Sequence, residues 1–113
     1  MGRGFDICFK NGLKGWATGG RTVILEYNNG LWTNYNRTEN LAYCGAVHFA
    51  DDGAGWAVGQ RTYKWNEAQN KWLYVEAPLR RGTLFDVFVL DEGDAWAVGD
   101  ARTIMHYQPK NGR

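Results

Sequence analysis

The chain has 113 residues, of which 44% are hydrophobic and 15% are aromatic, and its formal net charge is +1. The hydrophobic and aromatic content excludes a disordered chain, and the length suits one small domain with its own core. The near-neutral charge gives no reason to expect nucleic acid as a partner. No apolar run of about 18 residues is present to span a membrane, the N-terminus lacks the apolar core of a signal peptide, and no cellular compartment is indicated.

Four short strands joined by tight turns are predicted in the first part of the chain, at residues 5–9, 16–19, 23–27 and 31–35. The first strand alternates apolar residues with period two, which is typical of a strand with one buried face. Asn-Gly and Asn-Asn-Gly turns follow the first and third strands, because these residues tolerate the backbone angles of a hairpin. The same order continues in the second part of the chain, and its first three strands return in the last part.

A short phrase recurs at intervals of forty residues and organises the chain. It reads Gly-Trp-Ala-Thr-Gly at 15–19, Gly-Trp-Ala-Val-Gly at 55–59 and Ala-Trp-Ala-Val-Gly at 95–99. A second tryptophan recurs with the same spacing near the end of the first two units. These positions predict the structural core of a repeat: Trp16, Trp56, Trp96, Gly19, Gly59, Gly99, Trp32 and Trp72.

Units of about forty residues with four antiparallel strands predict an all-β, β-propeller-type fold. The chain would hold about 2.75 blades as a single repeat domain. The predicted boundaries are residues 4–40 for the first blade, 41–82 for the second and 83–113 for the incomplete third. A β-trefoil and a β-prism also use three units of this length, although neither of their sequence motifs is present.

The segment Trp-Ala-Val-Gly-Asp-Ala-Arg-Thr-Ile-Met-His-Tyr at 96–107 resembles blades of bacterial propellers that read W-A-V-G-D-G-G-T-I-L-H-Y followed by G-x-W. Photosystem II stability/assembly-factor-like propellers and Asp-box propellers of the sialidase type carry related blades. The resemblance covers nearly the whole chain and implies the propeller architecture. It leaves the function open, because such propellers serve many roles.

Catalytic and cofactor motifs are missing from the sequence. The chain has no serine, so Ser-His-Asp catalysis is excluded. His48 and His106 lie at non-equivalent positions, without the spacing of metal ligands, and no phosphate-binding glycine loop is present. Cys8 and Cys44 are predicted to be free, partly buried thiols. We therefore expect neither an enzyme nor a bound cofactor or metal.

Charged residues sort by loop type and suggest a candidate binding face on one side of the propeller. Arginines fall in the turns after the second strands and in the connections between units, and an aspartate begins two of the first strands: Arg21, Arg61, Arg102, Arg37, Arg80, Arg81, Asp6 and Asp86. Such a face suits an acidic protein, since arginine pairs well with carboxylates. The competing interpretation is that these charges pair locally and keep the surface soluble.

The same aspartates allow an enzymatic interpretation, because glycosidases use two carboxylates. Asp6 and Asp86 would supply them, beside the arginines that sialidases also use. Ala46 stands at the equivalent position of the second unit, and the Arg-Ile-Pro segment of sialidases is missing. We therefore predict a non-catalytic protein.

Three blades do not close a ring comfortably, so we predict a non-catalytic scaffold or binding module that completes its ring by self-association. Two chains giving six blades is the simplest count. One alternative is a carbohydrate-binding module of the lectin type, with a glycan ligand and with Tyr35, Tyr63 and Tyr74 as candidate surface contacts. Another is a propeller fragment, engineered or evolutionary, without a separate function.

Overall fold

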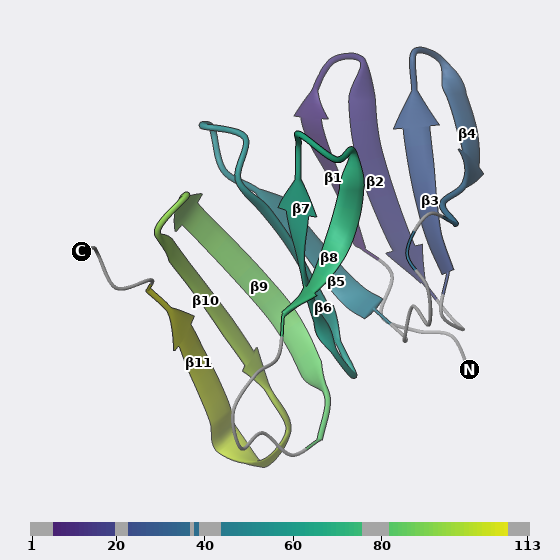
Figure 1. Ribbon diagram of the computed structural model, residues 1–113. Coiled ribbons are helices and arrows are strands. Elements are labelled where there is room, and N and C mark those ends of the chain that lie inside the picture. Colours follow the sequence, from purple (N-terminus) through teal and green to yellow (C-terminus); the bar gives the residue numbers. More distant parts are fainter. Residues whose placement is uncertain (1–5, 20–22, 37, 39–43, 76–81, 109–113) are drawn as a thin grey trace.

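The computed structural model describes residues 6–19, 23–36, 38, 44–75 and 82–108. These residues form eleven strands in three antiparallel sheets, and they contain no α-helix, only one turn of 3-10 helix at Asp100–Arg102 (η1). Figure 1 shows the sheets side by side in chain order, the first in purple to blue, the middle one in teal and the third in green to yellow. The predicted all-β class with antiparallel four-stranded units is confirmed.

Each sheet is built from strands that follow one another along the chain. The first sheet has the order β1 (Asp6–Asn11), β2 (Lys14–Gly19), β3 (Val23–Asn28) and β4 (Leu31–Asn34). The middle sheet has the order β5 (Cys44–Phe49), β6 (Gly55–Gly59), β7 (Thr62–Asn66) and β8 (Lys71–Val75). The third sheet contains β9 (Leu84–Asp91), β10 (Asp94–Gly99) and β11 (Thr103–Tyr107), with β10 in the centre.

Tight turns join the strands for the local reasons seen in the sequence. In the β3–β4 hairpin, Asn29 and Gly30 both have positive φ, at 48° and 99°, which asparagine and glycine tolerate better than other residues. In the β1–β2 turn, the Asn11 side chain accepts a hydrogen bond from the Leu13 N–H at 2.8 Å. Such side-chain bonds satisfy the turn backbone and let each strand reverse within a few residues.

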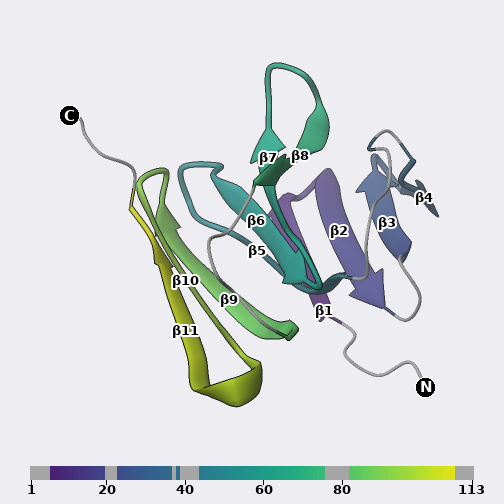
Figure 2. The same ribbon diagram turned by 60° about the horizontal axis from the view of Figure 1, so that its bottom comes forward.

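The first strands of the three sheets, β1, β5 and β9, lie next to one another, as Figure 2 also shows. Corresponding residues have the same pairing partners within each sheet. Cys8 lies opposite Trp16, His48 opposite Trp56, and Phe88 opposite Trp96. A residue in one sheet can therefore be compared directly with its counterpart forty positions further along.

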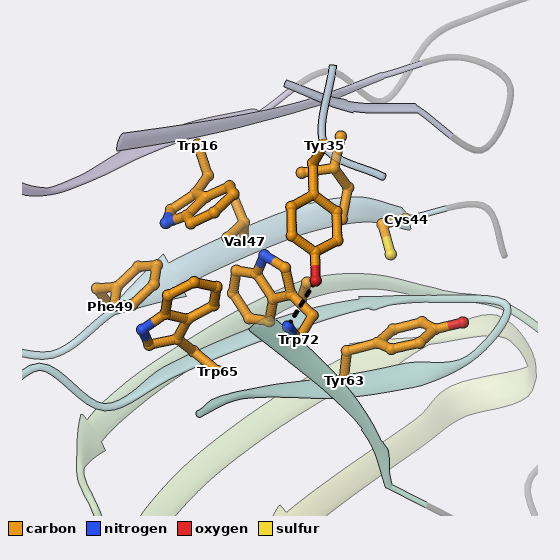
Figure 3. Packing of buried hydrophobic residues seen from close by; sticks show 10 residues of the cluster. Trp16, Tyr35, Cys44, Val47, Phe49, Tyr63, Trp65 and Trp72 are labelled. Atoms are coloured by element: carbon orange, nitrogen blue, oxygen red, sulfur yellow. Dashed lines mark hydrogen bonds between the residues drawn. The ribbon is translucent and has the colours of Figure 1, made fainter. Parts of the chain in front are cut away.

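Aromatic rings fill the space between the first and middle sheets (Figure 3). The Trp16 ring lies 4.8 Å from Trp65, 5.5 Å from Trp72 and 5.6 Å from Tyr35, measured between ring centroids. The Trp72 N–H donates a hydrogen bond of 2.9 Å to Tyr35 Oη. Tyr35 and Tyr63 are both buried here, so their assignment as surface contacts is wrong, whereas Tyr74 is exposed.

Smaller side chains pack between the middle and third sheets. Trp56 and Val58 from the middle sheet meet Leu84, Val87 and Tyr107 from the third. The Trp56 ring lies 4.5 Å from the Tyr107 ring, an arrangement equivalent to the Trp16–Trp65 pair. Alanines on β10 allow this sheet to approach closely.

Hydrogen bonds also join one sheet to the next, from a backbone N–H to a side chain about one unit earlier in the chain. The Phe49 N–H donates to Cys8 Sγ at 3.3 Å. The Val89 N–H donates to His48 Nδ1 at 2.8 Å. The Val47 N–H donates to Asp6 Oδ2 at 3.1 Å, and the Glu92 N–H to Asp52 Oδ2 at 2.9 Å. These bonds fix how the sheets lie against one another.

Neither Cys8 nor Cys44 is in a disulfide, and their different surroundings lead to a prediction about their reactivity. Burial raises the pKa of Cys44 to about 12. Burial also raises the pKa of Cys8, although the Phe49 N–H opposes the shift. Because the thiolate is the nucleophile, we expect a disulfide reagent to modify the half-buried Cys8 well before Cys44 in the native protein. Mass mapping of the labelled sites over time measures this, and equal rates at the two cysteines would contradict it.

Candidate functional site

The first sheet has an apolar face that points away from the rest of the molecule. We call it the leading face and define it by Ile7, Phe9 and Trp32. The Phe9 ring lies 6.1 Å from Trp32, with Tyr27 beside both. The counterparts of these residues in the middle sheet lie in the interior. Ile7 is 56% exposed whereas Val47 is 2% exposed, and Trp32 is 38% exposed whereas Trp72 is fully buried.

The third sheet turns away a second apolar face, which we call the trailing face and define by Phe88, Trp96 and Val98. Phe88 and Trp96 are paired across β9 and β10, and Trp96 stacks on His106 with ring centroids 3.8 Å apart. Exposure of the three recurring tryptophans is 0% for Trp16, 3% for Trp56 and 41% for Trp96. The difference has a simple reason: each of the first two faces the next sheet, and no further sheet follows Trp96 among the described residues.

The two open faces carry residues equivalent to the two sides of the interface between the first and middle sheets. Between the first and middle sheets, a face that carries Trp16 meets a face that carries Phe49 and Trp72. The trailing face carries Trp96 at the position of Trp16, and the leading face carries Phe9 and Trp32 at the positions of Phe49 and Trp72. Apolar patches of this kind mark interaction sites in soluble proteins.

The predicted charged face lies only partly within the described residues. Arg21, Arg37, Arg80 and Arg81 fall outside them. The Arg61 guanidinium lies 5.6 Å from the centre of the Tyr74 ring, and Arg102 is exposed in η1 with φ of 59°. Asp6 accepts hydrogen bonds from the N–H groups of Ile7 and Val47, and Asp86 accepts one from Val87. An acidic partner for this face stays a prediction.

At the edge of the sheets opposite the predicted charged face, carboxylates hold turns and neighbouring sheets together. Lys10 pairs with Glu67 at 3.6 Å, and Lys64 pairs with Glu92 of the next sheet. The N–H groups of Ala54 and Glu92 lower the pKa of Asp52 by hydrogen bonding to its carboxylate. In the same way, the Trp65 Nε1–H lowers the pKa of Glu67. These groups serve structure at this edge.

The recurring glycines lie at the ends of the second strands, and one of them allows close approach of the backbone. Gly19 pairs with Val23, Gly59 pairs with Cys44, and Gly99 pairs with Leu84. A Cβ at Gly99 would lie 2.3 Å from the Thr83 carbonyl oxygen, so only glycine fits there. No sequence motif indicates this contact or the inter-sheet hydrogen bonds of Cys8 and His48. Only the sheet-to-sheet geometry shows them.

The described part of the chain has no group of three His, Cys, Asp or Glu side chains placed to bind a metal ion. A separate search of these residues found no helix with the length and apolarity needed to cross a membrane.

Solved structures with a similar fold include the two described here, although no protein-family model and no curated protein matches the chain. The structure of YCF48 bound to D1 peptide matches with a TM-score of 0.77 and 18% identity, over 96% of this chain and 38% of that one. PorZ, a surface component of the type-IX secretion system of Porphyromonas gingivalis, matches with a TM-score of 0.69 and 17% identity, over 95% of this chain and 18% of that one. Both are β-propeller-type proteins. The three sheets therefore have the architecture of propeller blades.

Proposed function

We propose that the chain is a non-catalytic propeller module that acts by binding, and that copies associate head to tail, with the trailing face of one copy on the leading face of the next. The observation that supports this most directly is the exposure of equivalent tryptophans. Trp16 and Trp72 are fully buried where two sheets meet, whereas Trp96 and Trp32 are exposed on the open faces. Burying large apolar side chains stabilises such an interface by about 1.5–3 kcal/mol each.

Head-to-tail association uses two different surfaces, so it forms a ring only if the rotation between copies closes. Two copies would give six sheets, each equivalent to one blade, and propellers usually contain about four to eight blades. A peptide or protein is the kind of further ligand that such a scaffold would take, and the YCF48 structure contains a bound peptide. A glycan ligand has no specific contact in its favour here.

The experiment places one charge on each open face. Ile7→Glu blocks the leading face and Trp96→Glu blocks the trailing face, while Tyr74→Glu changes an exposed aromatic outside both. We expect the unmodified chain and Tyr74→Glu to oligomerise in sedimentation measurements at micromolar concentration. Each blocked variant alone should be a folded monomer. Their mixture should give a one-to-one pair, because one intact leading face then meets one intact trailing face.

Two results would overturn the proposal. A folded, unmodified chain that stays monomeric at these concentrations removes self-association. A dimer formed by Ile7→Glu alone would indicate contact between two trailing faces and hence a different symmetry. Circular dichroism of each variant separates loss of association from loss of folding.

A further inference from the structure

The outer edge of β11 is a surface distinct from both open faces. In the first and middle sheets the corresponding strands, β3 and β7, are each paired with a fourth strand, β4 or β8. Among the described residues β11 pairs only with β10, and it is the outermost strand of its sheet in Figures 1 and 2. A strand edge of this kind presents backbone N–H and C=O groups that another strand can pair with.

An apolar groove of about 190 Å³ lies beside this edge, between the middle and third sheets. Its walls include Trp56, Val58, Val75, Leu84, Met105 and Tyr107. For comparison, an apolar cavity of about 150 Å³ in another protein accommodates a benzene ring. The groove therefore has the size and the lining to take one aromatic side chain.

The equivalent place between the first and middle sheets shows what fills it. There, three rings pack together: Trp16 and Trp65 at 4.8 Å, with Trp72 of β8 at 5.5 Å and 5.3 Å from them. Beside the groove, Trp56 and Tyr107 form the first pair at 4.5 Å. The third ring has no counterpart among the described residues. Residues 108–113 contain no aromatic residue.

We propose that the β11 edge and its groove bind an extended peptide segment in trans, as a fourth antiparallel strand that carries a tryptophan. In the middle sheet, Trp72 lies opposite Trp65 and Tyr74 lies opposite Tyr63. The peptide's tryptophan accordingly lies opposite Tyr107 and enters the groove, and its residue two positions later lies opposite Met105. Backbone pairing gives the affinity and the aromatic pocket gives the selectivity, as in other cases of strand addition.

The test uses a synthetic peptide with the sequence of residues 69–76, Gln-Asn-Lys-Trp-Leu-Tyr-Val-Glu. We expect saturable binding by calorimetry, weakened about tenfold or more when its tryptophan is replaced by alanine. N-methylation of alternate residues should abolish binding for the set whose N–H groups face β11 and spare it for the other set. Tyr107→Ala in the protein, which removes one wall of the groove, should weaken binding as well.

The peptide experiment is run on Ile7→Glu, whose substitution lies on the leading face and far from the groove. Peptide binding by this variant would support strand addition. If the unmodified chain also shows no self-association, the head-to-tail proposal is overturned while strand addition stands. Absence of saturable binding, or equal binding of the alanine peptide, overturns strand addition whatever the oligomeric state. Equal tolerance of both N-methylated peptides also overturns it, because a strand needs its backbone groups.

Discussion

Replacing Trp16 with alanine is expected to lower the free energy of unfolding by about 3–5 kcal/mol, the range for a large aromatic residue removed from a core. Trp16 is fully buried and contacts the rings of Tyr35, Trp65 and Trp72. Its loss leaves a cavity between two sheets, and a backbone restrained on both sides cannot collapse to fill it. Urea denaturation followed by circular dichroism measures the change.

Trp96→Ala is the matched control, since it makes the same change at the equivalent position of the third sheet. Its ring is half-exposed and stacks on His106 alone among the described aromatic residues. We expect a loss of about 1 kcal/mol or less when the protein is monomeric, which the Ile7→Glu background ensures. Similar losses for Trp16→Ala and Trp96→Ala in that background would show that the sheets do not pack as described.

Gly99→Ala should destabilise the protein by about 1–3 kcal/mol, because the added methyl group has no room. It would lie 2.3 Å from the Thr83 carbonyl oxygen and 2.7 Å from Leu84 Cα. Both are backbone atoms, so relief requires a shift of the β9 main chain and not a side-chain rotation. The third sheet should separate first, and hydrogen exchange at β9 and β10 would report that opening.

Gly12→Ala tests whether the effect comes from crowding and not from the loss of a glycine. A Cβ at Gly12 meets no atom within 4 Å. We expect a change within about 0.5 kcal/mol, as for ordinary surface substitutions. If Gly99→Ala were equally mild, the close approach of β9 to β10 at this position would be refuted.

The strands and their order can be predicted from the sequence because each depends on neighbouring residues. Period-two alternation at 5–9 and turn residues such as Asn29-Gly30 specify hairpins without reference to the rest of the chain. Tyr35 shows the limit of such reasoning. Its burial and its hydrogen bond with the Trp72 N–H depend on how two separate sheets meet, which no local pattern contains.

The open faces could be anticipated in part. Spacing of forty residues identifies Trp16, Trp56 and Trp96 as equivalent, but equivalence in sequence does not give equal burial. Exposure depends on whether another sheet covers the residue, and this differs for Trp96. The groove beside β11 is still harder to predict from the sequence. Its walls come from two different sheets, and it is recognised only by comparison with the first and middle sheets, where a third ring occupies the equivalent position.

Each sheet is one uninterrupted stretch of chain, and this bears on how the protein folds while it is being synthesised. All the hairpins of one sheet can form before the next sheet leaves the ribosome, so early segments need not wait for distant partners. The hydrogen bonds from the Phe49 N–H to Cys8 and from the Val89 N–H to His48 would then form in sequence, each newly emerged sheet docking on the one before it. At each stage of synthesis, the exposed apolar face belongs to the most recently synthesised sheet. This is where the nascent chain would most need a chaperone.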